Sequence, residues 1–174
     1  MTFADKIRDR IKEVPDFPKP GISFKDITPL LFEPELYPEL IDEIAKPFAN
    51  EQVDFVAGME SRGFLYGMGL AHKLGAGFIP IRKKGKLPRP THTVSYDLEY
   101  GSAELELHRE DIPRGSRVLI HDDLLATGGT ASAALQLIQK MEAEVVGLCF
   151  IIELDFLNGR ERLGTRNLHS LVHY

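Results

Sequence analysis

Two adjacent acids followed by a loop rich in glycine and threonine are the most informative feature of the sequence. Residues 118–130 read Val-Leu-Ile-His-Asp-Asp-Leu-Leu-Ala-Thr-Gly-Gly-Thr. Glycines let the backbone approach an anion closely, and the free N–H groups and dipole at a helix start favour negative charge. The hydroxyls of Thr127 and Thr130 add donors, so the loop can wrap a phosphate. Asp122 and Asp123 would repel that anion, so they must face ribose hydroxyls, a metal ion or both.

Other common explanations for this loop fit less well. A plain turn at Gly128 and Gly129, with one acid as a helix cap, would not need two acids, two threonines and two glycines together. A P-loop requires Gly-Lys-Ser or Gly-Lys-Thr, and the Rossmann fingerprint requires Gly-x-Gly-x-x-Gly; the sequence contains neither. The sequence therefore favours an anion-binding loop.

A second loop has a similar character. Residues 60–63 read Glu-Ser-Arg-Gly, follow an apolar run at 55–58 that predicts a strand, and precede a predicted helix at 64–74. The N–H groups at the helix start and the Arg62 guanidinium can therefore clamp a second anion. A surface turn with a solvated Arg62 is the alternative.

The densest basic cluster follows the next predicted strand, at 77–82. It lies in a chain of formal net charge −5 and consists of Arg82, Lys83, Lys84, Lys86 and Arg89. Such clusters are commonly solvated. Residues 83–94, however, are polar, contain one glycine and two prolines, and offer almost no apolar anchor. Because the cations repel one another and these residues disfavour regular structure, we expect a mobile loop that closes like a lid over a polyanion.

Alternating strands and helices position these loops. Further strands are predicted at 117–121 and 145–154, with a helix at 130–141 between them. The β-α-β-α-β order indicates an α/β fold with a mainly parallel sheet flanked by helices. Open parallel sheets bind ligands at the carboxyl ends of their strands, where these loops begin.

Outside that pattern, periodicity predicts three more elements. Residues 103–107 alternate apolar and acidic side chains, which predicts a strand exposed on one face. Helical spacing of apolar residues predicts amphipathic helices over 3–14 and 36–48. A stretch rich in proline at 15–21 ends the first of them.

Composition sets the class of protein. With 43% hydrophobic and 27% charged residues, the 174-residue chain is typical of one soluble globular domain. Its negative net charge argues against general nucleic-acid binding, and no apolar run approaches the ~18 residues of a membrane span. Cys149 is the single cysteine, so an intrachain disulfide is excluded and a reducing compartment is favoured. The early Asp5, with no apolar run after it, argues against a signal peptide. We expect a cytoplasmic protein without nucleic-acid or membrane partners.

The stretch at 118–130 resembles the phosphoribosyl-pyrophosphate signature of type I phosphoribosyltransferases. Its form, Asp-Asp-Leu-Leu-Ala-Thr-Gly-Gly-Thr, is similar to the adenine-specific branch of that family. The resemblance covers nearly the whole chain, through matching segments at 15–18, 21–26, 60–64, 82–88, 95–101 and 159–161.

This resemblance implies an architecture and an activity. The fold would be that of the type I family in a single domain over residues 1–174, with a small N-terminal hood over about 1–35, a core over about 36–174 and a flexible lid loop over about 83–100. The activity would be that of a glycosyltransferase of the pentosyltransferase class, in purine salvage and AMP biosynthesis. Adenine and phosphoribosyl pyrophosphate would give AMP and pyrophosphate. Mg²⁺ dependence and a homodimer are also implied.

The resemblance further implies site roles. The 5′-phosphate would be held by Ala126, Thr127, Gly128, Gly129 and Thr130, and the ribose hydroxyls by Asp122 and Asp123. Pyrophosphate would be bound by Glu60, Ser61, Arg62, Arg82, Lys83 and Lys86. The loop at Glu60 and Ser61 often holds a non-proline cis peptide in the family. No direct protein ligand of Mg²⁺ is implied, and Asp122 and Asp123 are candidates for contact through water.

The base and the chemistry involve two other regions. The implied adenine pocket consists of Ser23, Phe24, Lys25 and Leu154. Backbone near Ser23 and Lys25 would read the exocyclic amine, while the Phe24 ring would stack on the base; from the sequence alone, core packing of Phe24 is the alternative. Glu99 and Tyr100, delivered by the lid, are the candidate catalytic residues. Glu99 either takes the proton of the attacking purine or serves as a charge partner for the basic lid.

One residue departs from the family pattern, and two other functions stay open. His121 stands where the family usually has an apolar residue; it either tunes the adjacent acids or is packed and hydrogen-bonded, the interpretation that we favour. A phosphoribosyltransferase for another purine base would need an acid that reads a 6-oxo group. A regulator that senses phosphoribosyl pyrophosphate would need a basic face or a DNA-binding extension.

Overall fold

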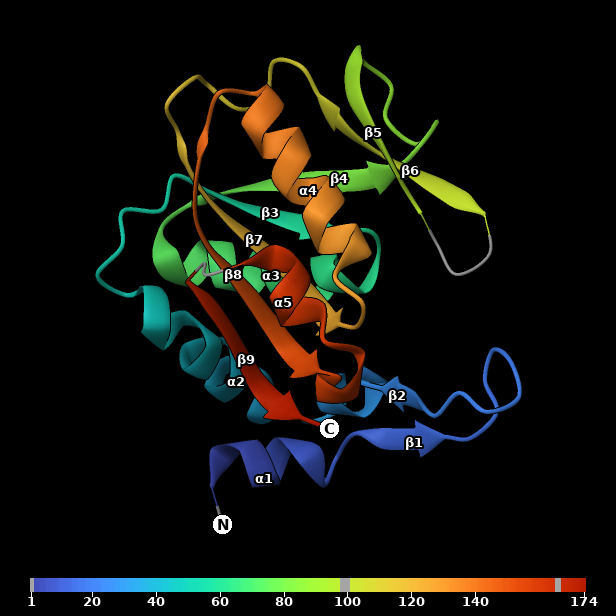
Figure 1. The fold of residues 1–174 in the computed structure, drawn as a ribbon. Helices are drawn as coiled ribbons and strands as arrows, with labels where there is room; N and C mark the ends of the chain where they lie inside the picture. The colour runs from blue at the N-terminus through green and yellow to red at the C-terminus, as the bar shows by residue number, and fades with distance from the viewer. Residues whose placement is uncertain (1, 98–100, 165–166) are drawn as a thin grey trace.

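The computed structural model describes residues 2–97, 101–164 and 167–174 and shows an α/β architecture (Figure 1). The main sheet consists of β3 (Phe55–Met59), β4 (Gly77–Lys83), β5 (Thr91–Asp97), β6 (Ser102–His108), β7 (Arg117–Leu125), β8 (Glu144–Glu153) and β9 (Leu168–His173). Its strand order is β5-β6-β4-β3-β7-β8-β9. The five strands from β4 to β9 in this order are parallel, and β5 and β6 form an antiparallel extension. The predicted mainly parallel sheet is confirmed.

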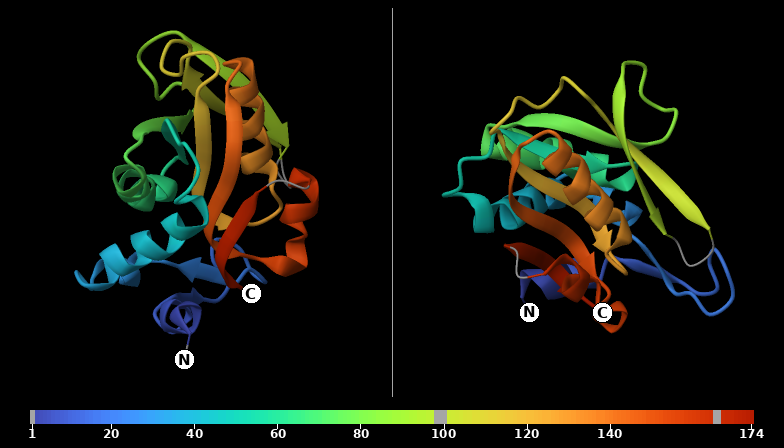
Figure 2. Two further views of the ribbon diagram at one scale, coloured as in Figure 1. Left: turned by 90° about the vertical axis from the view of Figure 1, so that its left-hand side faces the viewer. Right: turned by 45° about the horizontal axis from the view of Figure 1, so that its top comes forward.

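Helices cover both faces of this sheet. They are α1 (Phe3–Arg8), α2 (Leu36–Ala45), α3 (Arg62–Leu74), α4 (Gly129–Lys140) and α5 (Gly159–Leu163), with short 3-10 helices η1 (Thr28–Leu31), η2 (Lys46–Phe48) and η3 (Asp155–Leu157). Figure 2 shows α2 and α3 on one face and α4 and α5 on the other. Two apolar cores result: Tyr66 and Leu70 of α3 belong to one, and Ala133 and Leu137 of α4 to the other. Among the described residues, no helix has the length and apolar character needed to cross a membrane.

The chain order creates a switch point in the middle of the sheet. From β3 the chain passes through α3 to β4 on one side, whereas β7, on the other side of β3, leads through α4 to β8. The helices that follow these adjacent strands thus diverge, which opens a crevice at the carboxyl ends of β3 and β7. Both predicted anion loops, after β3 and after β7, lie at this crevice.

The first predicted helix is wrong beyond Arg8. Residues Lys12–Val14 form β1, which pairs with β2 (Phe24–Asp26) in a two-stranded antiparallel sheet. Val14 precedes a proline, which disfavours helical backbone, and its β-branched side chain suits a strand. Pairing with β2, a strand that the periodicity did not reveal, then holds residues 12–14 in an extended conformation.

The predicted loop at 83–94 is also shorter than expected. Thr91–Asp97 forms β5 because every residue of it pairs with β6, and Val94 is buried as an apolar anchor. The strand predicted at 103–107 is confirmed as β6, but its acidic face is not exposed. Glu106 is only 7% exposed because its carboxylate accepts the N–H of Gly85 across the loop.

Candidate active site

A pocket of about 210 Å³ opens at the switch point. Its walls come from the end of β7, the loop that follows and the start of α4, with one cation from the start of α3. The lining residues are Met59, Arg62, Asp122, Asp123, Leu124, Leu125, Ala126, Thr127, Gly128, Gly129, Thr130, Ala131 and Phe150. The structure therefore brings together both acids and the whole predicted phosphate loop.

The loop is shaped to present backbone donors. Gly128 is the N-cap of α4 at φ +78°, a left-handed conformation that favours glycine, and α4 has no side-chain cap. The first N–H groups of an uncapped helix have no intrahelical partner and point away from its start. Thr127 is exposed and Thr130 half-buried, so their hydroxyls flank the same space. This arrangement suits a phosphate, as the sequence predicted.

The two acids lie inside β7, not after it as predicted. The strand continues to Leu125 because β8 pairs with it as far as Glu153. Asp122 and Asp123 are thereby partly removed from water, and the Asp123 N–H donates to Asp122 Oδ1 over 2.9 Å. Burial, and then the neighbouring Asp123 carboxylate, raise the pKa of Asp122 well above its usual value. Burial also raises the pKa of Asp123, although the Arg62 guanidinium opposes the effect.

Arg62 links the acids to the hood. Its Nε lies 2.8 Å from Asp123 Oδ2, and its guanidinium lies 4.7 Å from the centroid of the Phe24 ring. Behind it, Gly63 packs so tightly on β7 that a Cβ there would lie 2.8 Å from Asp122 Oδ1. The loop after β3 and the acids of β7 are therefore in direct contact, and Arg62 is paired rather than solvated.

The loop between β3 and α3 carries the predicted second anion site. The peptide bond between Glu60 and Ser61 is cis, and Ser61 is an exposed N-cap whose side chain makes no cap hydrogen bond. Glu60 Oε2 accepts the Lys83 N–H over 2.9 Å and lies 3.2 Å from Arg82 Nε. Burial acts to raise the pKa of Glu60, but the Lys83 N–H and the Arg82 guanidinium outweigh it, so this pKa lies below its usual value. Glu60 thus holds Arg82 and Lys83 in place at the start of residues 82–90, which we call the basic segment.

The basic cluster is not self-repelling, contrary to the prediction. Lys84 Nζ lies 2.6 Å from Glu104 Oε2, and Arg89 Nη2 lies 2.7 Å from Asp111 Oδ1. Arg82 also donates to the backbone carbonyl of Lys86, whose own side chain is exposed. Acids of β6 and of the turn after it, distant in sequence, supply these partners.

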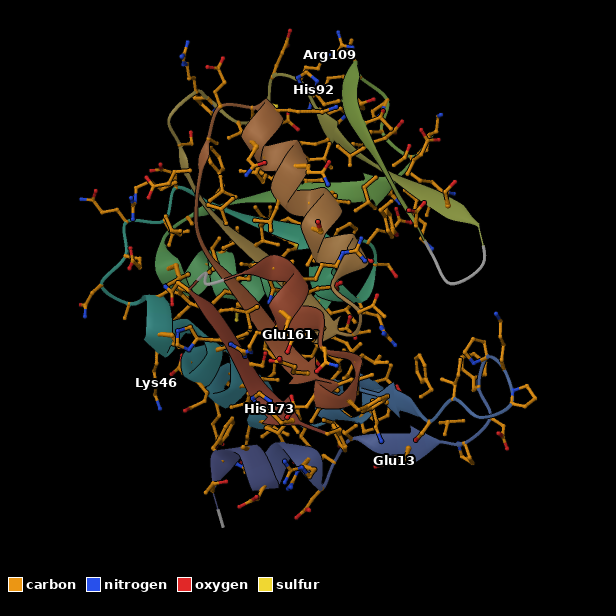
Figure 3. The ribbon with its side chains drawn as sticks, viewed as in Figure 1. Glu13, Lys46, His92, Arg109, Glu161 and His173 are labelled. Carbon is orange, nitrogen blue, oxygen red and sulfur yellow. The ribbon has the colours of Figure 1, made fainter. Side chains whose placement is uncertain are left out.

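The hood brings the predicted base-binding residues beside the pocket. Phe24 and Leu154 are both half-buried, and the centroids of the Phe17 and Phe24 rings lie 5.2 Å apart at an interplanar angle of 78°. The exposed Ser23 donates from its Oγ to Glu13, which lies on β1 (Figure 3).

The Lys25 side chain is used within the protein. It is 7% exposed, its Nζ lies 2.8 Å from Glu13 Oε2, and the same ammonium lies 4.2 Å from the centre of the Tyr174 ring. Only the backbone of Lys25 is thus available to a ligand.

His121 is packed, but it is not hydrogen-bonded as predicted. The side chain is fully buried, and neither ring nitrogen has a hydrogen-bond partner. Burial lowers the pKa of His121 to about 4, and the nearby backbone of Cys149 offsets that effect only in part. The imidazole is therefore neutral beneath the acids at neutral pH.

Two predicted site residues are not among those that the structure describes, and the structure adds residues that the sequence did not predict. Glu99 and Tyr100 fall outside the described residues. Met59 and Phe150 form an apolar part of the pocket wall that no sequence motif indicated. The contact of Gly159 with the phosphate loop was also missed, although its segment carried part of the family resemblance.

The oxygen donors of the pocket allow only limited binding of a divalent cation. Among the described residues, the one group of three or more potential ligands is Glu153, Asp155 and His173, and none of them lines this pocket. The pocket offers Asp122 and Asp123, and the latter is paired with Arg62. Such a donor set fits Mg²⁺ held mainly by ligand phosphates, with the carboxylates contacting it through water.

Comparison with known proteins gives a consistent result. The model of the phosphoribosyl transferase domain matches residues 35–164. An adenine phosphoribosyltransferase from Methylococcus capsulatus is 53% identical over 170 residues, which cover 98% of this chain and 99% of the relative.

Solved structures agree with that match. The crystal structure of adenine phosphoribosyltransferase from Thermoanaerobacter pseudethanolicus superposes with a TM-score of 0.96 at 44% identity and covers 98% of this chain and 99% of its own. The enzyme from Saccharomyces cerevisiae, complexed with an imino-altritol bisphosphate and adenine, gives a TM-score of 0.92 at 41% identity, with 97% and 98% covered. The type I fold expected from the sequence is confirmed.

Proposed function

The chain belongs to the phosphoribosyl transferase family, in its adenine-specific branch, and from this membership we propose how its residues divide the reaction among them. The reaction transfers the 5-phosphoribosyl group of phosphoribosyl pyrophosphate to adenine and yields AMP and pyrophosphate. It breaks an anomeric C–O bond while a C–N bond forms, so it requires alignment and a stabilised leaving group more than a protein nucleophile. Cys149 offers none, because burial raises the pKa of its thiol to about 12.

One observation carries the assignment: two anion loops flank a pair of carboxylates at the switch point of the sheet. Ala126, Thr127, Gly128, Gly129 and Thr130 bind the 5′-phosphate through free N–H groups and hydroxyls. Asp122 and Asp123 accept hydrogen bonds from the ribose hydroxyls, between the two loops. A phosphorylated ribose fits this arrangement, because its phosphate matches the donors of the loop and its hydroxyls match the two carboxylates.

The second loop and the basic segment bind pyrophosphate. Support comes from the exposed Ser61 at the start of α3 and from the cations beside it, Arg62, Arg82, Lys83 and Lys86. Glu60 holds Arg82 and the Lys83 backbone in place, so its role is to position these cations. Cations at this site stabilise the charge that develops on the leaving group.

Adenine occupies the space between the hood and the sheet. The half-buried Phe24 ring stacks on the base, Leu154 contacts its other face, and backbone at Ser23 and Lys25 accepts the exocyclic amine. The Lys25 side chain is already bound to Glu13, which supports reading of the base by backbone alone. The family resemblance places an arginine at this position in some relatives; because the base is read by backbone, Lys25 should leave the specificity for adenine unchanged.

Two further groups take part in the chemistry. Asp122 and Asp123 would hold Mg²⁺ through water, and the ion, bound together with phosphoribosyl pyrophosphate, would neutralise charge on the departing pyrophosphate. Glu99 takes the proton from the attacking purine nitrogen, with Tyr100 beside it.

The same proposal extends to the whole chain, as one domain over residues 1–174 with a hood over about 1–35, a core over about 36–174 and a lid over about 83–100. A homodimer is supported by large apolar side chains that stand exposed: Leu65 and Met68, one turn apart on α3, and Phe32 after η1. Sedimentation of the Met68→Glu variant tests whether the protein is a homodimer.

A cytoplasmic location is supported by the single, buried Cys149, since reducing compartments disfavour disulfides. Cell fractionation tests this location.

A panel of bases tests the function. Pyrophosphate release is measured with adenine, hypoxanthine, guanine and xanthine, each with phosphoribosyl pyrophosphate and Mg²⁺. A site built to accept hydrogen bonds from an amine can discriminate by about 10⁴ against an oxo analogue. Adenine should therefore be used far better than the other bases, and comparable turnover of hypoxanthine would contradict the assignment. The Asp122→Asn variant is the matched control for a contaminating activity.

A further inference from the structure

We propose that α5 forms a third wall of the 5′-phosphate site, in which Gly159 shapes the phosphate loop and Arg162 supplies its cation. This inference rests on the proposed assignment of residues 126–130 to the 5′-phosphate. Neither Gly159 nor Arg162 belongs to the motif at residues 118–130, and both follow it by about thirty positions.

The backbone of Gly159 touches the phosphate loop directly. A Cβ on Gly159 would lie 2.1 Å from the carbonyl oxygen of Ala126 and 3.1 Å from the nitrogen of Gly128. Conversely, a Cβ on Gly128 would lie 2.7 Å from the carbonyl oxygen of Gly159. Because these neighbours are backbone atoms, no rotamer change could relieve the clash. The path of the loop therefore depends on glycine at position 159 as well as at position 128.

Among the residues that the structure describes, those lining the pocket include no unpaired cation. Its charged lining side chains are the two aspartates and Arg62, and Arg62 is already paired with Asp123. A phosphate monoester carries close to two negative charges at neutral pH, whereas the start of a helix offers only about half a positive charge. Free N–H groups alone would thus leave a phosphate under-neutralised beside two carboxylates.

Arg162 lies where the missing charge is needed. A Cβ built on Gly129, the first residue of α4, would lie 3.6 Å from Nη1 of Arg162. The side chain is exposed and forms no ion pair with any residue that the structure describes. A guanidinium in this place can reach an anion bound at the α4 N–H groups and donate two parallel hydrogen bonds.

The other arginine of α5 holds this helix in place. Arg160 donates from Nε and Nη2 to the two carboxylate oxygens of Glu153, over 3.0 and 2.6 Å, and from Nη1 to the carbonyl of Leu168. It thereby ties α5 to β8 and β9. The two arginines thus have separate tasks: Arg160 fixes the helix, and Arg162 extends from it toward the loop.

Binding measurements with and without the phosphate test the proposal. The affinities for AMP and adenosine are measured by calorimetry for the wild type and for Arg162→Gln, Arg162→Lys and Arg114→Gln. Arg114 is the matched control: it is exposed, paired with Glu142, and precedes β7 at the end of the strand away from the pocket. Arg162→Gln should weaken AMP binding by about three- to tenfold and leave adenosine binding unchanged. Arg162→Lys should keep part of the affinity, and Arg114→Gln nearly all of it.

Two glycine variants test the second part of the proposal, that Gly159 shapes the phosphate loop. Gly159→Ala should lower AMP affinity selectively. Gly147 is also crowded, since a Cβ there would lie 2.6 Å from the Phe48 ring and 2.8 Å from the carbonyl oxygen of Asn167, but it lies outside the pocket. Gly147→Ala should therefore lower thermal stability without changing the AMP-to-adenosine ratio. An unchanged ratio in both Arg162→Gln and Gly159→Ala would overturn the role of α5. If the wild type itself binds AMP no better than adenosine, the 5′-phosphate assignment fails, whatever Arg162 does.

Discussion

At the scale of single residues, burial determines how the two acids of the pocket behave. The pKa of Asp122 is raised from its usual 3.8 by burial and by Asp123. A carboxyl whose folded pKa exceeds its unfolded value stabilises the fold below the unfolded pKa, and this contribution is lost as the pH rises through the folded pKa. At neutral pH this stabilisation is reduced or lost, so the buried Asp122 costs stability relative to a neutral side chain, which is the pattern of a residue kept for function.

We predict that Asp122→Asn loses activity by about 10²-fold while its melting temperature at pH 7 equals or exceeds that of the wild type. The gain should vanish below about pH 4, where the wild-type carboxyl is also protonated. Steady-state kinetics and thermal melting at pH 7 and pH 4 measure both effects, with the exposed Asp9→Asn as control. Activity near that of the wild type would show that Asp122 does not hold the ribose.

His121 gives the opposite dependence on pH. Its pKa falls from 6.5 to about 4 in the folded protein, so its contribution to stability is complete above pH 6.5 and is lost as the pH falls through 4. We predict that the wild type loses about 3 kcal/mol relative to His121→Leu between these pH values. Urea unfolding of both proteins from pH 7.5 to 4 measures the difference. His72→Gln, at an exposed histidine of α3, keeps His121 and should follow the wild type across this pH range; equal slopes for all three proteins would contradict the prediction.

At the scale of elements, the sequence predicted what local patterns determine and missed what distant partners determine. The core strands and helices of the sheet carry continuous apolar runs or helical spacing, so β3, α3, β7 and α4 were found within a few residues. β1 was mistaken for helix because only the ladder with β2 makes Lys12–Val14 extended. The partners of the basic segment, Glu104 and Asp111, likewise come together only through folding.

The basic segment and β5 should differ in exchange behaviour. We predict that amides of 83–90 exchange faster than those of β5 in the free protein, since β5 is fully paired with β6 and the segment is mostly exposed. Pyrophosphate with Mg²⁺ should slow exchange in 83–90, because the exposed Lys83 and Lys86 would bind the anion and hold the segment over it. Hydrogen exchange read by mass spectrometry measures this, with the turn at 17–22 as an internal control. Equal exchange of 83–90 with and without ligand would refute closure over the site.

At the scale of the whole molecule, an acidic chain gathers part of its positive charge at one crevice. The protein carries a net charge of −5, yet the segment after β4 and the start of α3 gather cations at one crevice. Such a local field attracts a polyanion, and salt weakens it because the screening length falls from about 10 Å at 0.1 M to about 3 Å at 1 M.

We predict that the KM for phosphoribosyl pyrophosphate rises severalfold between about 0.05 and 0.5 M KCl, while the KM for adenine, which is uncharged, changes little. Initial rates at fixed saturating co-substrate measure the two constants. Lys86→Gln should flatten the salt dependence, whereas Arg114→Gln should not, because Arg114 lies at the other end of β7. A parallel rise of both constants would point to a general effect of salt on the enzyme.

The position of Arg62 over Phe24 also bears on the order in which substrates enter. With the guanidinium 4.7 Å from the ring centre, Arg62 covers the aromatic surface meant for the base. A polyanion that draws Arg62 toward itself would uncover the ring, so we expect phosphoribosyl pyrophosphate to enter first and adenine second. Adenine should then bind the free enzyme weakly, bind more tightly once pyrophosphate and Mg²⁺ are present, and bind Arg62→Met without that requirement. Calorimetric titration measures the affinity for adenine of the free enzyme, of the enzyme with pyrophosphate and Mg²⁺, and of Arg62→Met. Equal affinities in the three cases would indicate random entry.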